Sequence, residues 1–173
     1  MPCRFRAQNL MRRFLVFMQW LLFLIPLGLL GCALPVDRTE SEEAPKLLAK
    51  IERGPCYGAC PIFSLAIYFD GTAVFHGTRN TKVMGERVFT LTDNQLSGIR
   101  AAFTQKGFLI MNNNCCDCYE ITDASSTIIT YQGNGPFKQI EHYHGCNNWW
   151  SQKLSELEAL VLEVTGVDKL VEE

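Results

Sequence analysis

The chain has 173 residues, with 16 basic and 18 acidic side chains. Residues 1–31 hold four of the sixteen basic residues and none of the eighteen acidic ones, so the remainder carries 12 basic against 18 acidic residues, a net charge of −6. A protein with this negative charge lacks the basic surface that binding to nucleic acid requires, and the charge does not favour binding to anionic lipid.

The first 31 residues predict a signal peptide. A basic start precedes an apolar run over residues 14–30, and a leucine-glycine pair then leads directly to Cys32. This order resembles a bacterial lipoprotein signal, in which cleavage precedes the cysteine and its thiol receives a diacylglycerol. A transmembrane helix fits less well, because Gln19 and Pro26 interrupt a run of borderline length. We therefore expect lipidation at Cys32.

Residues 32–46 follow as the lipidated cysteine and an acidic tether with two prolines, a composition typical of a flexible linker. Ala33 stands where retention signals for the inner membrane usually place aspartate, which favours an outer-membrane protein facing the periplasm. The expected contact with the membrane is through acyl chains alone. Residues 47–170 have the right length for one domain with its own core.

The domain begins with strand patterns. Residues 47–51 and 62–69 are apolar runs separated by a loop rich in glycine and proline, and Asp70-Gly71 predicts a hairpin that returns over residues 72–78. A two-residue turn would pair Ile67 with Val74 and Leu65 with His76. That register places Val74 on the core face of the sheet.

Further elements follow in alternation. Residues 82–91 predict a strand, and the capping box Thr92-Asp93-Asn94-Gln95 predicts a helix that ends before Gly107. A second hairpin is expected over residues 127–143, and helical spacing of apolar side chains resumes at Trp149. The order predicts an α+β fold, with an antiparallel sheet and two helices packed on one face.

Six cysteines remain after removal of Cys3 and modification of Cys32. Export places them in an oxidising compartment, where disulfides form and persist. Six thiols allow fifteen full pairings, and spacing alone does not choose among them. The six are Cys56, Cys60, Cys115, Cys116, Cys118 and Cys146.

Three motifs carry a family resemblance. They are Cys56-Tyr57-Gly58-Ala59-Cys60-Pro61, Cys118 followed by Thr122-Asp123-Ala124, and His142-Tyr143-His144-Gly145-Cys146. Their set and order resemble the bacterial family called domain of unknown function 6438, over roughly residues 51–162. The resemblance implies a shared α+β fold and no established activity. The present chain departs from the pattern by adding Cys115 and Cys116.

Disulfides are the simplest role for these cysteines. A bond between Cys118 and Cys146 would close a long loop and stabilise the domain by roughly 3.6 kcal/mol, whereas one between Cys56 and Cys60 would contribute about 2 kcal/mol. The adjacent Cys115 and Cys116 could form a vicinal disulfide, stay reduced or compete with Cys118. We expect a disulfide-stapled single domain.

A metal site is the alternative. His142 and His144 lie two residues apart on an expected strand, so their imidazoles project to the same face. Together with Cys115 and Cys116 they offer the nitrogen and sulfur ligands that suit zinc or copper. However, thiolates in an oxidising compartment tend to form disulfides, and no paired C-x₂-C spacing is present. Hydrogen-bonded packing of His142 is the simpler account, and no cofactor is expected.

An exposed binding surface is the remaining possibility. Tyr57 lies in a loop stiffened by proline, and Tyr143 and Trp149 flank Cys146. Asp123, from the second of the three motifs, is a further candidate for this surface. Rigid aromatic side chains suit recognition of an envelope protein, peptide or glycan. We therefore expect a non-catalytic binding or structural module anchored by lipid in the cell envelope. The alternative function is a metal-binding or thiol-active envelope protein.

Overall fold

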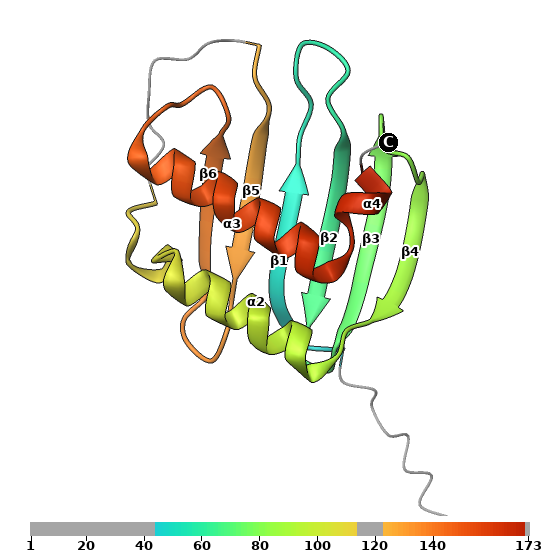
Figure 1. Cartoon of the computed structure of the whole chain (residues 1–173), viewed down its shortest axis with the longest axis vertical. Coiled ribbons are helices and arrows are strands. Elements are labelled where there is room, and N and C mark those ends of the chain that lie inside the picture. The colour runs from blue at the N-terminus through green and yellow to red at the C-terminus, as the bar shows by residue number, and fades with distance from the viewer. Residues whose placement is uncertain (1–43, 114–122, 172–173) are drawn as a thin grey trace, which may run out of the picture. The chain divides into compact units, whose positions relative to one another are not determined.

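The computed structural model describes residues 44–113 and 123–171, which form one domain built on a six-stranded antiparallel sheet (Figure 1). The order of the strands across the sheet is β4-β3-β2-β1-β5-β6, so the first strand of the chain lies in the middle. The strands are β1 (Leu47–Arg53), β2 (Ile62–Tyr68), β3 (Thr72–Arg79), β4 (Gly85–Thr90), β5 (Ser126–Tyr131) and β6 (Lys138–Tyr143).

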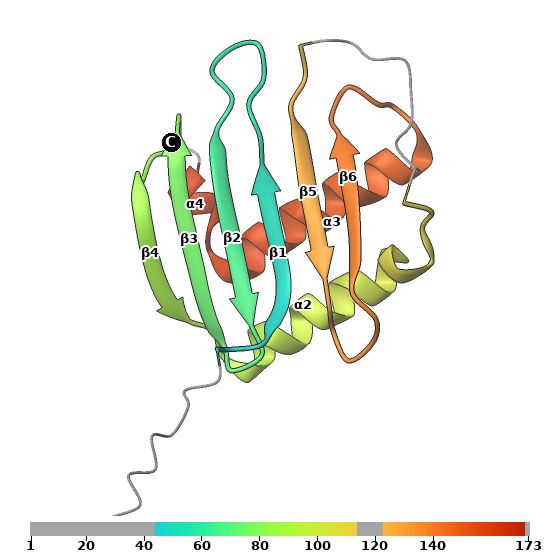
Figure 2. The same ribbon diagram turned by 180° about the vertical axis from the view of Figure 1, so that it is seen from behind.

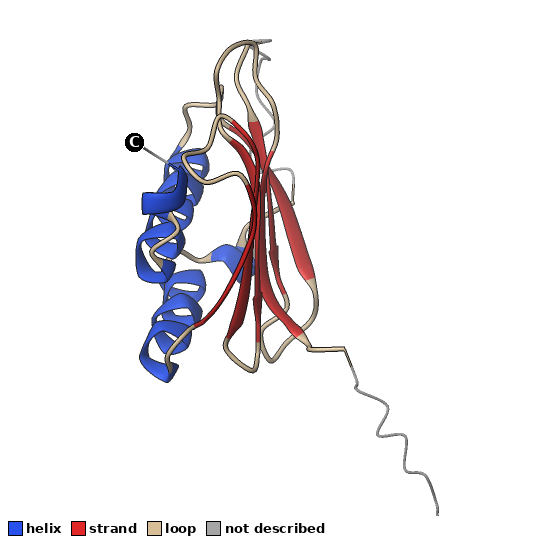
Figure 3. Cartoon of the chain, turned by 90° about the vertical axis from the view of Figure 1, so that its right-hand side faces the viewer, coloured by secondary structure: helices blue, strands red, loops and turns tan. Residues whose placement is uncertain are grey.

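All helices lie on one face of this sheet, as the edge-on view shows (Figure 3). They are α2 (Asp93–Gln105), the short 3₁₀ helix η1 (Phe108–Ile110), α3 (Trp149–Thr165) and α4 (Asp168–Val171). Seen from behind, the other face of the sheet carries no helix in the described part of the chain (Figure 2). The predicted α+β class, with an antiparallel sheet and two main helices on one face, is confirmed. None of the helices within residues 44–113 and 123–171 is long and apolar enough to cross a membrane.

Helix α2 begins where its capping box predicts. The Thr92 hydroxyl accepts a hydrogen bond from the Gln95 backbone N–H at 3.3 Å, and the Gln95 side-chain oxygen accepts one from the Thr92 N–H at 2.9 Å. This exchange satisfies two N–H groups that the first turn of a helix otherwise leaves without partners. The predicted apolar stripe is the buried one, and it consists of Leu96, Ile99, Ala102 and Phe103.

The core fills the space between the sheet and helices α2 and α3. Phe103 of α2 stacks on Tyr131 of β5 with ring centroids 4.2 Å apart, and Phe108 of η1 meets Phe103 edge-on at 5.1 Å. Side chains of β1 and α3 complete the layer, among them the fully buried Ile51 and Leu154. Each fully buried side chain of this size contributes roughly 1.5–3 kcal/mol through removal of apolar surface from water.

The hairpin between β2 and β3 differs from the prediction. Its loop has three residues rather than two, and Ile67 pairs with Ala73 while Leu65 pairs with Phe75. The loop ends at Gly71, whose φ of +89° lies in the left-handed region that favours glycine. Because one extra residue shifts the register, the predicted pairing of Ile67 with Val74 and of Leu65 with His76 is wrong.

The shifted register also exchanges the faces of β3. Phe75 and Ala73 are fully buried beneath the helices, whereas Val74 lies on the uncovered face. His76 is exposed there and lies opposite Ser64 and Glu86. The sequence pattern around Asp70-Gly71 therefore locates the turn but not its length.

Gly71 provides a test of this turn. A Cβ atom at this position would lie 2.9 Å from the backbone oxygen of Leu91, and the positive φ strains any other residue. We expect Gly71→Ala to lower the free energy of unfolding by about 1–3 kcal/mol in urea denaturation.

Gly135→Ala is the matched control. Gly135 has no positive φ, and its added Cβ would meet no atom within 4 Å. We expect its stability to change little or to rise slightly. Equal effects of the two substitutions would contradict the three-residue turn.

Candidate functional site

Three polar residues on adjacent strands, paired across the sheet, lie beneath α3. Arg53 of β1 pairs with Thr127 of β5, and Thr127 pairs with His142 of β6. Side chains alternate between faces along a strand, and Ile51 and Ile140, two residues from Arg53 and His142, are buried under the helices. The three polar residues therefore face the same helix layer.

Glu158 of α3 faces these three polar residues from the helix layer. It belongs to the buried stripe of α3, next to Leu154, Leu157 and Val161, and is only 1 % exposed. Arg53 Nη2 donates to Glu158 Oε2 at 2.7 Å, and His142 Nδ1 lies 2.5 Å from Glu158 Oε1. A buried carboxylate is tolerated only when it is paired, and here both of its oxygens have partners.

The partners of Glu158 keep it ionised. Burial alone raises the pKa of this carboxyl group, but the hydrogen bond from His142 and the positive charge of Arg53 outweigh burial. The pKa of Glu158 consequently lies below its ordinary value. Because a carboxylate only accepts hydrogen bonds, Nδ1 of His142 must carry a proton.

The second ring nitrogen of His142 is also engaged. His142 Nε2 lies 2.9 Å from Ser151 Oγ, which lies 2.9 Å from the backbone oxygen of Cys146. A serine hydroxyl has one hydrogen, so it donates either to Cys146 or to His142. In the first case His142 donates from both nitrogens and is an imidazolium, and in the second it is neutral. The network thus ties β6 to the start of α3.

His144 lies beside this network and is partly accessible. Its side chain is 24 % exposed, and its Nε2 atom lies 2.7 Å from Thr127 Oγ1 and 3.5 Å from Glu158 Oε2. Burial lowers the pKa of His144 to about 4, with His142 and Arg53 acting in the same direction and Glu158 opposing them. His144 is therefore a neutral hydrogen-bonding group at pH 7.

The chemistry open to this cluster is limited by burial. Ser151, His142 and Glu158 are connected in the order of a catalytic serine triad. However, His142 is fully buried and Ser151 is 3 % exposed, and the hydroxyl also contacts the Cys146 carbonyl group. A substrate carbonyl has no route to this oxygen in the structure, so the arrangement acts as an internal support.

A metal ion would have to compete with the same contacts. Donor atoms of His142, His144 and Glu158 lie within 4.8 Å of one another. Both nitrogens of His142 already bind protein groups, and the positive Arg53 guanidinium contacts Glu158. These three side chains form the geometric basis of the metal alternative. The further predicted ligands, Cys115 and Cys116, lie outside the described residues.

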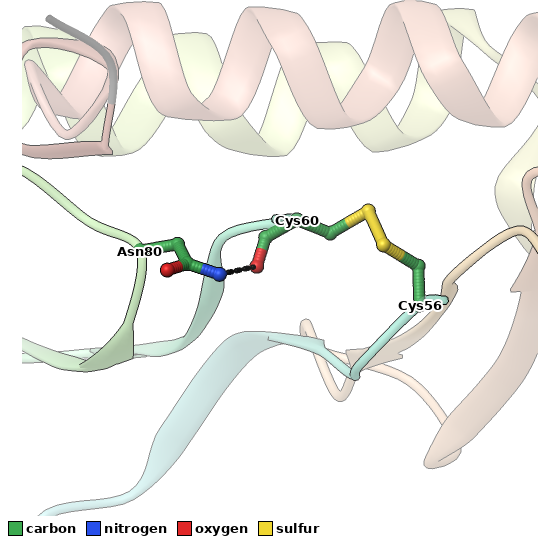
Figure 4. Close-up of a disulfide and its surroundings, with 3 residues drawn as sticks. All are labelled: Cys56, Cys60 and Asn80. Carbon is green, nitrogen blue, oxygen red and sulfur yellow. Dashed lines mark hydrogen bonds between the residues drawn. A yellow bond between two sulfur atoms is a disulfide. The ribbon is translucent and has the colours of Figure 1, made fainter. Parts of the chain in front are cut away.

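The predicted disulfide between Cys56 and Cys60 is present, with Cα atoms 5.8 Å apart (Figure 4). Asn80 of the β3–β4 loop holds it in place, because its side-chain N–H donates to the Cys60 carbonyl oxygen at 3.1 Å. Asn80 is the one non-glycine residue in the described part of the chain with a positive φ, at 53°. Cys146 is also disulfide-bonded, and its partner lies outside the described residues, as does the predicted partner Cys118.

The predicted binding-surface residues differ in exposure. Tyr57 is 88 % exposed at the tip of the disulfide loop, and its backbone N–H donates to the carbonyl oxygen of the exposed Asp123 at 3.2 Å. Trp149 is 59 % exposed and packs against Trp150 at the start of α3. Tyr143 is half-buried, and its hydroxyl has no hydrogen-bond partner among residues 44–113 and 123–171. The structure therefore brings Tyr57 and Asp123 together.

Sequence reasoning identified His142 but missed Arg53, Glu158 and Ser151. Two of them left a signal in the sequence. Arg53 continues the alternation of Ala49 and Ile51 towards the core, and Glu158 occupies a core position in the apolar stripe of α3. Opposite charges at core positions of two different elements indicate a buried ion pair.

The sheet order, the two covering helices and the buried network define a two-layer α+β domain. The family model described as Domain of unknown function (DUF6438) matches residues 48–165, so the chain belongs to this family. The matched range includes β1 apart from Leu47, the strands β2 to β6 and the whole of α3. No curated protein and no solved structure matches the chain.

The lowered pKa of His144 predicts a pH dependence of stability. The unfolded chain takes up a proton on this residue below about pH 6.5, whereas the folded chain does so only near pH 4. Stability therefore falls as the pH drops through this window, by up to about 3 kcal/mol. We expect His144→Gln to remove this part of the difference between urea denaturations at pH 7 and pH 4.5.

The exposed His76 supplies the matched control. His76→Gln should keep the pH dependence of the original protein. An unchanged pH dependence in His144→Gln would contradict the assignment.

Proposed function

We propose that this protein is a lipid-anchored protein of the cell envelope whose domain is a non-catalytic binding module. The single observation that carries the proposal is the rigid presentation of Tyr57. Its loop is held by the Cys56–Cys60 bond, by Asn80 and by the hydrogen bond to Asp123. An exposed aromatic side chain on a loop fixed at three points loses little entropy when a partner binds.

The position of this loop supports the same function. The described domain begins just before β1, and the loop follows the opposite end of that strand (Figure 1). A strand of seven residues spans roughly 20 Å, so the loop and the start of β1 lie at different ends of the sheet. Tyr57 therefore lies at the end of the sheet opposite to the one where β1 begins.

The buried network supports a role other than catalysis. Ser151 and His142 have no access to solvent that a nucleophile and its base would need, and Glu158 is held by Arg53. The expected partner is an envelope protein, peptide or glycan. The metal-binding alternative rests on the approach of His142, His144 and Glu158, and it requires displacement of the contacts that they make now.

The proposed anchor depends on Cys32. In a bacterial host that receives the full-length chain and an alkyne-tagged fatty acid, the original protein should be cleaved and labelled. We expect Cys32→Ser to remain at precursor size without label. Cys3→Ser, which changes a cysteine of the proposed signal peptide, should be processed and labelled normally. Labelled, cleaved Cys32→Ser protein would refute the anchor.

The proposed binding surface depends on Tyr57. A photo-crosslinking phenylalanine analogue placed at position 57 of the full-length protein in living cells should give a discrete crosslinked product. The same analogue at Val88, which is 61 % exposed on the uncovered sheet face, should not. Replacing Cys56 and Cys60 by serine should reduce the product several-fold, because the loop then loses its constraint.

Two results would count against this surface. One is equal crosslinking from positions 57 and 88, and the other is no product at position 57 under conditions in which the protein is fully anchored.

A further inference from the structure

A pocket of about 330 Å³ lies between the C-terminal ends of β1 and β6 and the helices α3 and α4. It is separate from the Tyr57 loop and uses different residues. Its size is at the lower limit for pockets that bind small molecules. The polar lining comprises Arg53, His144, Ser155, Glu158 and Asp168, and the apolar lining comprises Ala159, Leu162 and Val171.

Arg53 offers hydrogen-bond donors to this pocket. Its Nη2 atom binds Glu158, and its Nε atom lies 3.4 Å from Thr127 Oγ1. The remaining nitrogen, Nη1, makes no hydrogen bond within the described residues, and the side chain is 20 % exposed. The guanidinium is also fixed over the Phe63 ring at 5.5 Å. Arg53 lines the pocket, so a carboxylate that enters it would meet a guanidinium whose orientation these contacts already fix.

Asp168 offers the complementary acceptor. Its Oδ1 atom is buried and has no hydrogen-bond partner in residues 44–113 and 123–171, and the carboxylate forms no ion pair there. Asp168 is part of the pocket lining, so an N–H donor of a ligand would bind its carboxylate where that group faces the pocket.

The charges of the lining select the sign of the ligand group. Arg53 and Glu158 form an ion pair, so their opposite charges largely cancel. The charge left without a partner is that of Asp168. It favours an ammonium group, while the Arg53 guanidinium favours a carboxylate.

We propose that this pocket binds a small zwitterion of the α-amino acid class. The carboxylate would bind Arg53, the ammonium group would bind Asp168, and an alkyl side chain would lie against Leu162 and Val171.

Three ligands that share one alkyl group test this site. Leucine carries both charges, 3-methylbutylamine lacks the carboxylate, and 4-methylpentanoate lacks the ammonium group. Each is titrated to 20 mM into the full-length isotope-labelled protein in a non-ionic detergent, and the amide signals of His144 and Ser155 are followed by NMR. Leucine should bind about tenfold or more tightly than either analogue, since each lacks one charged contact.

Two variants locate the binding. Asp168→Asn should weaken leucine binding about tenfold or more, whereas Glu163→Gln, which removes an exposed charge from α3, should leave it unchanged. Ala159→Phe places a large side chain at the exposed rim of the pocket and should abolish binding without disturbing the core.

Three results would overturn the proposal. They are the absence of shifts with leucine in the original protein, equal affinity for leucine and the amine, and full leucine binding by Ala159→Phe. None of these measurements involves the lipid anchor or the Tyr57 loop, so their failure is distinguishable from failure of the proposed function.

Discussion

The fold depends on how the carboxylate of Glu158 is neutralised. A charge buried at this depth costs several kcal/mol unless oppositely charged and hydrogen-bonding groups surround it. Those groups come from two strands that are not neighbours, Arg53 of β1 and His142 of β6, with β5 between them. The ion pair can form only when β5 is in place and α3 crosses above it. One side chain thereby fixes the positions of three strands and a helix.

This constraint divides the domain into two ends with different chemistry. At the end where β1 begins, the core is aromatic, with Tyr131 and Phe108 packed on Phe103. At the opposite end, the paired residues Arg53, Thr127 and His142 are polar. The loops that follow β1 and β6 at this end carry disulfide-bonded cysteines. Covalent bonds at this end constrain the loops that follow β1 and β6. The exposed Tyr57 and the polar pocket consequently share a rigid support.

The sequence predicts most of the architecture, because local rules decide it. Thr92 and Gln95 fix the start of α2, and alternation identifies most strands. The register of the first hairpin was not predictable, because a two-residue and a three-residue turn can both use Asp70-Gly71, and only the packing of Phe75 in the core selects the longer one. The Glu158 network was missed because its members lie far apart along the chain. Its pairing is a property of the tertiary structure.

The same network explains why an internal support and a ligand site can share Arg53. A guanidinium has five N–H donors in a planar fork, and Glu158 and Thr127 engage only one side of it. These contacts hold the sheet to α3, and the same guanidinium lines the pocket. Since the ion pair and the Phe63 ring already fix the orientation of Arg53, a ligand would not have to order this side chain. Structural rigidity in the core is thus a precondition for recognition at the rim.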